Sequence, residues 1–238
     1  MRTRIALPDY ALSDFVLSSA ARDRAHELIP AGAHTYSKGD DQFPQLCPAQ
    51  LVRGRGARTW DADGNEFVDW GMGLRSVILG HCDSGVLDAV RSALDLGSNL
   101  TRPSPIEAEV AELFVENIPS AEMVKFAKNG SDVTTAAARL ARAYTGRDLI
   151  ARCAEHPFYS VHDWFIGDTV MNSGVPEATR NLTKRFHYND ARSLADLFEE
   201  YPRQIAMVML EAVVVDPPAD GFLEEVRRLC TEIGRAHV

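Results

Sequence analysis

The chain has 238 residues, a formal charge of −9 at neutral pH and a sequence pI of about 5.3. An acidic balance argues against a nucleic-acid-binding surface, and no apolar run reaches the length needed to span a bilayer. The N-terminus lacks the apolar core of a signal peptide, and the four cysteines are scattered without a CxxC pair. We therefore expect a cytoplasmic globular protein with no nucleic-acid or membrane partner.

The first part of the chain predicts short elements separated by turns. Helices are indicated by apolar residues at i, i+3, i+4 spacing, and the hairpin by an Asp-Gly pair between two strand-like runs. The expected elements are a helix over 13–29, a long loop over 33–50, a hairpin centred on Asp63-Gly64, a helix over 84–96 and a helix that opens with a capping box from Ser104 to Glu107.

The stretch Lys128-Asn-Gly-Ser-Asp132 stands between an apolar run over 123–127, which predicts a buried strand, and a helical pattern over 133–144. Ser131 or Asp132 is expected to cap this helix, and Gly146 to end it in a left-handed conformation. Free backbone N–H groups at the positive end of a helix dipole bind anions, so the turn predicts a phosphate site. The alternative is an ordinary Asn-Gly turn and cap that hold no ligand.

Helices and strands then alternate, which is typical of an α/β fold with a mainly parallel sheet. The expected elements are strands over 148–153, 183–187 and 205–210, helices over 191–200 and 220–233, and a loop with a short helix over 154–182. In such sheets ligands bind beyond the carboxyl ends of the strands. Glu211 follows the apolar strand 205–210, so its carboxylate either faces the phosphate pocket or is a solvated strand end.

At this point the motifs, taken together and in order, resemble class III pyridoxal-phosphate aminotransferases, the family that includes glutamate-1-semialdehyde aminomutase. The resemblance covers roughly residues 20 to 232. The motifs that carry it are the hairpin Trp60-Asp-Ala-Asp-Gly-Asn-Glu-Phe-Val-Asp69, the turn Leu79-Gly-His81, the turn Asn129-Gly-Ser-Asp132 in place of Ser-Gly-Thr-Glu, the segment Arg139 to Asp148, Glu211 in place of the Glu of Val-Glu-Pro, and the helix Phe222 to Cys230.

The resemblance implies a fold-type I α/β transferase with a mainly parallel sheet and helices on both faces. It also implies that this chain is a truncated form of that fold. Residues 1–70 would form the N-terminal arm and part of the small domain, and residues 71–238 an incomplete large domain. The implied cofactor is pyridoxal 5'-phosphate, and the implied partners are a small-molecule amino donor, a carbonyl acceptor and a second copy in a homodimer. Loop 33–50 and Gly71–Gly73 would contact substrate or partner. The cofactor-binding candidates are Asn129, Gly130, Ser131, His156, Phe158 and Glu211.

The sequence also departs from the family. Glu155-His156-Pro157 stands where the family often has Tyr-His-Gly, so Phe158 or Tyr159 would have to supply the aromatic ring that packs on the cofactor. His156 is then either a pocket residue or a loop histidine.

The family's Asp for the pyridine nitrogen and its Schiff-base Lys are not found, and none of the four lysines, Lys38, Lys125, Lys128 and Lys184, matches the Lys position. We therefore expect no catalytic residue within this chain, a catalytically inactive and marginally stable fragment, and an unpaired strand edge at 205–210 or at another strand that would adjoin missing ones. The rival hypothesis is a non-catalytic phosphate- or nucleotide-binding module. Residues 233–238 depart from the resemblance, and we expect them to be sequencing-adapter read-through.

Overall fold

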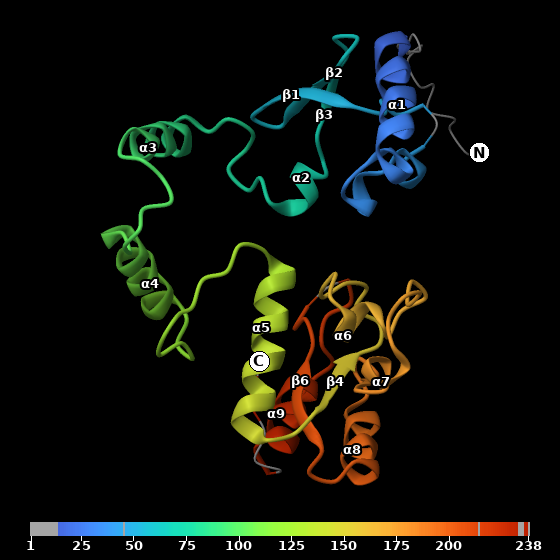
Figure 1. Ribbon diagram of the computed structural model, residues 1–238, viewed down its shortest axis with the longest axis vertical. Coiled ribbons are helices and arrows are strands. Elements are labelled where there is room, and N and C mark those ends of the chain that lie inside the picture. The colour runs from blue at the N-terminus through green and yellow to red at the C-terminus, as the bar shows by residue number, and fades with distance from the viewer. Residues whose placement is uncertain (1–13, 45, 214, 233–235, 238) are drawn as a thin grey trace, which may run out of the picture. The chain divides into compact units, whose positions relative to one another are not determined.

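A computed structural model describes residues 14–44, 46–213, 215–232 and 236–237. The chain divides into two compact units, Met1–Pro105 and Ile106–Val238 (Figure 1). The boundary expected near residue 70 refers to the domains of a whole enzyme, and it stays a prediction.

The first unit is built around a small antiparallel sheet of three strands in the order β1-β2-β3. The predicted hairpin is confirmed as β2 and β3, whereas β1 was not predicted. The long loop is confirmed, and it contains two 3-10 turns, Tyr36–Lys38 and Asp40–Gln42. The elements are α1 (Val16–Leu28), β1 (Leu51–Arg55), β2 (Arg58–Asp61), β3 (Glu66–Val68), α2 (Met72–Arg75) and α3 (Ser84–Asp95).

The hairpin tip also caps the first helix. Helix α1 has Phe15 at its N-cap position, and Phe15 supplies no side-chain cap. Instead the Asp63 carboxylate accepts hydrogen bonds from the backbone N–H groups of Leu17 (2.7 Å) and Ser18 (2.8 Å). A carboxylate at this position satisfies free amides and complements the helix dipole. The Asp-Gly turn therefore ties together segments about 45 residues apart.

The second unit holds a parallel sheet in the order β5-β4-β6-β7. The predicted strands near 148–153, 183–187 and 205–210 are confirmed, as are the helices over 133–144, 191–200 and 220–233. The elements are α4 (Pro105–Asn117), α5 (Gly130–Thr145), β4 (Leu149–Cys153), α6 (Asp163–Ile166), α7 (Glu177–Arg180), β5 (Thr183–Phe186), α8 (Ala191–Glu200), β6 (Ile205–Met209), α9 (Phe222–Glu232) and β7 (Ala236–His237).

Two apolar clusters, one on each face of this sheet, confirm that helices cover both faces. On one face Ile150 and Met207 pack with Ala138 of α5 and with Trp164 and Phe165 of α6. The cluster on the other face joins the strands to α8 and α9, and it consists of Leu149, Ala151, Cys153, Phe186, Leu194, Phe198, Ile205, Val208, Phe222, Val226, Leu229 and Cys230. Strands β4 and β6 are both buried along their whole length. Strand β6 has the continuous apolar sequence of a strand covered on both sides, whereas β4 includes one charged residue, Arg152.

Two expectations about strands are wrong. Residues 123–127 do not form a strand: no described strand pairs with them, Met123 is 91% exposed, and Phe126 packs edge-on against Phe114 of α4. Apolar sequence alone does not make a strand, because a strand also needs a hydrogen-bonding neighbour. The unpaired edge expected at 205–210 is wrong for that strand, since β6 lies between β4 and the two-residue strand β7. The alternative, an unpaired edge at another strand that would adjoin missing ones, stays a prediction.

Candidate functional site

The N-terminus of α5 carries the predicted phosphate site. Asn129 is the N-cap residue: its side-chain oxygen accepts a hydrogen bond from the Asp132 amide at 3.0 Å. The expected cap, Ser131 or Asp132, is therefore wrong by two or three positions, because the helix begins at Gly130. Asn is among the best N-cap residues. Among the described residues nothing accepts from the amides of Gly130 and Ser131, so both donors are available to an anion.

The Ser131 side chain completes this donor set. Its Oγ accepts a hydrogen bond from the Val161 amide at 3.1 Å. A hydroxyl that accepts one hydrogen bond still has a proton to donate. The turn can therefore offer two amide N–H groups and one hydroxyl to a phosphate at the positive end of a 16-residue helix.

The loop that follows β4 is fastened to the first turns of α5. Thr134 Oγ1 donates to the Tyr159 carbonyl oxygen (2.9 Å), and the Trp164 indole N–H donates to Thr135 Oγ1 (2.9 Å). Trp164 is 5% exposed and Tyr159 is 7% exposed. The phosphate turn and the carboxyl end of β4 thus form one packed structure.

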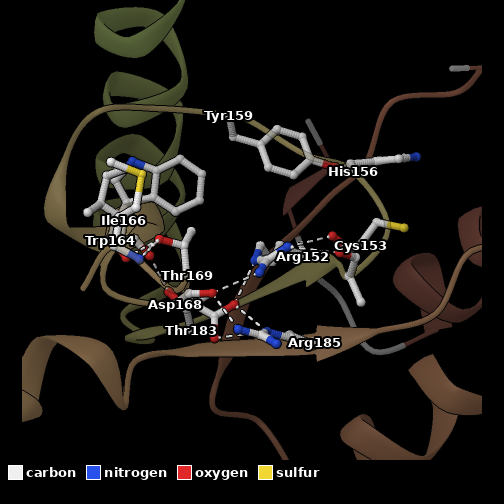
Figure 2. Close-up of polar contacts among 12 residues, drawn as sticks. Arg152, Cys153, His156, Tyr159, Trp164, Ile166, Asp168, Thr169, Thr183 and Arg185 are labelled. Atoms are coloured by element: carbon white, nitrogen blue, oxygen red, sulfur yellow. Dashed lines mark hydrogen bonds and ion pairs between the residues drawn. The ribbon is translucent and has the colours of Figure 1, made fainter. Parts of the chain in front are cut away.

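His156 and Glu211 meet at the carboxyl ends of β4 and β6. His156 Nδ1 lies 2.9 Å from the Glu211 amide nitrogen, which donates to it. The same nitrogen lies 2.6 Å from the Tyr159 hydroxyl (Figure 2). His156 is only 3% exposed, and burial lowers the pKa of its imidazole. Burial also raises the pKa of Tyr159. The Glu211 side chain is exposed and has no hydrogen-bond partner among the described residues.

The structure brings most of the candidate residues together. Asn129, Gly130 and Ser131 are consecutive at the helix terminus. Tyr159 links them to His156, because its carbonyl is held by α5 and its hydroxyl reaches the imidazole. Phe158 is 53% exposed, and its ring contacts Phe165 edge-on with centroids 5.7 Å apart. Of the two aromatic candidates, only Phe158 therefore has a ring face available to a ligand.

A buried ion-pair cluster behind this site was not predicted. Arg152 of β4 is 4% exposed, and its Nε donates to Asp168 Oδ2 at 2.6 Å. Arg185 of β5 also donates to the Asp168 carboxylate, at 2.8 Å (Figure 2). Both guanidinium groups reach the Asp168 carbonyl oxygen as well. Asp168 lies 16 residues beyond Arg152, and no spacing rule connects the two.

Two neighbouring groups show strong pKa shifts. Burial alone would raise the pKa of Glu155, but hydrogen bonds from His187, the Tyr188 amide and Cys153 Sγ outweigh burial and lower it to about 2. Burial raises the pKa of the Cys153 thiol to about 11. Glu155 is thus a fixed carboxylate that ties the end of β4 to the end of β5.

The first unit has a cavity of about 710 Å³ lined by parts of loop 33–50, β1, β3 and Gly71–Gly73. The Asp69 carboxylate lies there, 2.7 Å from His81 Nε2, and this hydrogen bond holds the pKa of Asp69 below its ordinary value. The two segments expected to contact substrate or partner therefore share one cavity. Whether they contact substrate or partner stays a prediction.

The turn Leu79-Gly80-His81 has a steric explanation. Gly56 and His81 exchange backbone hydrogen bonds of 2.8 Å. A Cβ on Gly80, whose φ is +97°, would lie 3.1 Å from the Gly56 Cα, and a Cβ on Gly54 would lie 2.6 Å from His81 Cγ. Glycine at these positions lets the turn approach β1 and lets the imidazole reach Asp69.

Within the described residues, no helix has the length and apolarity to cross a membrane. No group of three or more His, Cys, Asp or Glu side chains there is placed to hold a metal ion.

Comparison with solved structures defines the class of protein. The FumI protein of Sphingopyxis sp. MTA144, solved in its PLP internal aldimine form, matches with a TM-score of 0.84 and 31% identity over 92% of this chain and 53% of its own. An omega-transaminase from Sphaerobacter thermophilus matches with a TM-score of 0.83 and 26% identity over 92% and 53%. The chain thus has the α/β fold of the pyridoxal-phosphate transaminases.

The sequence comparisons define the family. Residues 36–238 match the family described as "Aminotransferase class-III", so the chain belongs to the class-III aminotransferase family. It is 34% identical over 241 residues to glutamate-1-semialdehyde 2,1-aminomutase 2 of Halalkalibacterium halodurans, and 33% identical over 236 residues to the aminomutase 1 of Listeria innocua. Each alignment covers 94% of this chain and 54% of the relative, so the chain spans about half the length of these relatives. The resemblance in the sequence motifs is confirmed.

Proposed function

We propose that this chain is the N-terminal part of a pyridoxal-phosphate-dependent aminotransferase or aminomutase, which moves an amino group between an amine and a carbonyl compound. The observation that carries the proposal is the N-terminus of α5, where two unpartnered amides and the Ser131 hydroxyl converge. The family match gives this anion site its ligand class. Small-molecule amino donors and carbonyl acceptors would be the substrates, and a homodimer the working form.

The residues present fit the cofactor. The amides of Gly130 and Ser131 and the Ser131 hydroxyl would bind the phosphate, and Asn129 would keep the amides in position. The exposed ring of Phe158 would pack against the pyridine ring, and Glu211 would present its carboxylate from the end of β6. When bound, pyridoxal phosphate supplies the electron sink for amino transfer.

This chain does not by itself hold the lysine that the chemistry needs. Lys38, Lys125 and Lys128 are exposed, and the Lys184 ammonium lies over the Tyr201 ring at 4.7 Å. None of these four positions matches the Schiff-base Lys of the family. We therefore expect residues 1–238 to bind the cofactor without transferring amino groups. Borohydride reduction with pyridoxal phosphate, followed by mass spectrometry, tests this: stoichiometric labelling of one lysine together with turnover would contradict it.

Titration of pyridoxal phosphate against three variants tests the site. Ser131→Ala removes one hydroxyl donor, so affinity should fall by about 0.5–1.5 kcal/mol, roughly 2- to 13-fold. Ser131→Thr keeps the hydroxyl and should bind like the wild type. Ser92→Ala is the matched control, because among the described residues the Ser92 hydroxyl bonds only to the Asp88 carbonyl in its own helix α3. Equal affinities for Ser131→Ala and Ser131→Thr would refute the phosphate assignment.

The rival, a non-catalytic phosphate- or nucleotide-binding module, uses the same turn and is separated by ligand choice. The proposed function requires pyridoxal phosphate to bind more tightly than inorganic phosphate, because Phe158 and Glu211 would add contacts to the ring. Tighter binding of a nucleotide than of pyridoxal phosphate would favour the rival.

A further inference from the structure

His156 makes an unusual contact at the end of the sheet. The parallel ladder between β4 and β6 has its last paired residues at Arg152 and Met209. Two residues further on, the Glu211 amide donates to His156 Nδ1 at 2.9 Å instead of to a strand carbonyl. The imidazole thus extends the pairing of two strands by a side chain, at the edge where ligands of such sheets bind.

This contact assigns the tautomer of His156. A backbone amide can only donate, so Nδ1 must accept and carries no proton. The Tyr159 hydroxyl, 2.6 Å away, can direct its proton at the same nitrogen. The ring proton is therefore on Nε2. A proton on Nδ1 would face the N–H of Glu211, and two hydrogen-bond donors repel each other.

The charged groups around the ring are few. Glu211 and Glu155 favour the protonated imidazole and Arg152 disfavours it, while burial has the largest effect and lowers the pKa. The phenol rings of Tyr159 and Tyr188 lie against the imidazole, with centroids 6.0 Å and 5.2 Å away. Burial among aromatic rings therefore agrees with a neutral ring.

The peptide after β6 is held from its other side as well. The Tyr188 hydroxyl donates to the Ala212 carbonyl oxygen at 2.7 Å, and the Tyr188 ring packs edge-on against Phe222 of α9. The backbone at 211–212 is thus held by an imidazole at one end and a phenol at the other. The Glu211 side chain is exposed and has no hydrogen-bond partner among the described residues, so this clamp acts on its backbone and sets the direction in which Cα–Cβ leaves the sheet.

We propose that His156 is a positioning residue, a neutral Nε2–H imidazole that fixes the Glu211 backbone and so aims the Glu211 carboxylate beside the phosphate site. The proposal rests on the proposed function for its ligand. In this role His156 does not bind the phosphate, because its Nδ1 already accepts a hydrogen bond from the Glu211 amide. His156 then affects binding of the whole cofactor but not of phosphate alone.

The first test is spectroscopic and needs no ligand. In protein with ¹⁵N-labelled histidine at neutral pH, Nδ1 of His156 should be unprotonated and Nε2 protonated. Backbone amide exchange at Glu211 should become about tenfold faster in His156→Leu, since one hydrogen bond is lost. It should be partly restored in His156→Asn, whose side-chain oxygen can accept from the amide. A proton on Nδ1, or unchanged exchange in His156→Leu, would overturn the proposal.

The second test separates this proposal from the proposed function. Affinity for pyridoxal phosphate should fall several-fold in His156→Leu, with affinity for inorganic phosphate unchanged, whereas Ser131→Ala should weaken both. Equal loss of both ligands in His156→Leu would overturn the positioning role. If the wild type binds no pyridoxal phosphate, the proposed function fails, and the tautomer and exchange results still decide the role of His156. If His156→Leu does not fold, the tautomer in the wild-type protein decides it.

Discussion

Replacing Asp168 with alanine should be among the most destabilising single changes in the second unit. Its carboxylate receives hydrogen bonds from Arg152 at 2.6 Å and from Arg185 at 2.8 Å. The side chain of Arg152 is 5% exposed and that of Asp168 15% exposed, whereas that of Arg185 is 51% exposed. Asp168→Ala therefore leaves a guanidinium buried without its counter-ion.

The magnitude follows from this difference in exposure. Removing one partner of a buried ion pair costs about 3–5 kcal/mol, because the remaining charge is uncompensated. Exposed pairs contribute only about 0–1 kcal/mol. Arg185→Met is the matched control, since it removes the exposed partner of the same carboxylate. The double variant Arg152→Met/Asp168→Ala should be less destabilised than the sum of its single variants, because no buried charge is left.

Urea unfolding of the purified variants, followed by circular dichroism, measures these free energies. The expected order of destabilisation is Asp168→Ala well above Arg185→Met. If Asp168→Ala costs as little as Arg185→Met, or if the double variant shows simple additivity, the buried pair does not stabilise the fold in the way the geometry indicates.

Three further changes test local features. The pKa of Glu155 is lowered from 4.5 to about 2, so its stabilising effect is complete above about pH 4.5 and is lost as the pH falls toward 2; Glu155→Gln should flatten the urea midpoint against pH in that window. Gly54→Ala should cost about 1–3 kcal/mol in thermal unfolding, because its Cβ would meet the His81 ring at 2.6 Å, whereas Gly71→Ala, with its nearest contact at 3.5 Å, should cost under about 0.5 kcal/mol. Asn129→Ala should cost about 1 kcal/mol and Asn129→Ser only a few tenths, as measured by urea unfolding; equal losses would contradict the capping role.

Most elements of the fold could be predicted because their signals are local. Apolar spacing located α5, α8 and α9, and the unbroken apolar run of β6 indicated a strand covered on both faces. The run 123–127 is also mostly apolar, with Lys125 as its one charged residue. It misled because strand formation depends on a pairing neighbour that composition does not reveal. Strand β1 was missed for the converse reason: three of the five residues in Leu51–Arg55 are charged or glycine, and the partner strand β2 determines its conformation.

The site was predictable only in part. The phosphate turn has a sequence signal, Asn-Gly-Ser before a helical pattern, although the cap is Asn129. The cluster of Arg152, Asp168 and Arg185 has none, because its members come from β4, a loop and β5 and meet only when the parallel strands align. Tyr159 could be named as an aromatic candidate, but its role as the link between α5 and His156 depends on tertiary contacts.

The cap that Asp63 provides to α1 makes two distant segments depend on each other during folding. An isolated 13-residue helix is marginal in water, and the N-cap residue of α1 is a phenylalanine, whose side chain cannot satisfy the first amides. Those amides remain unsatisfied by protein until the chain has passed residue 63 and the hairpin has turned. The cap of α1 can therefore be completed only once β2 and β3 have formed their hairpin, although α1 precedes them in the sequence.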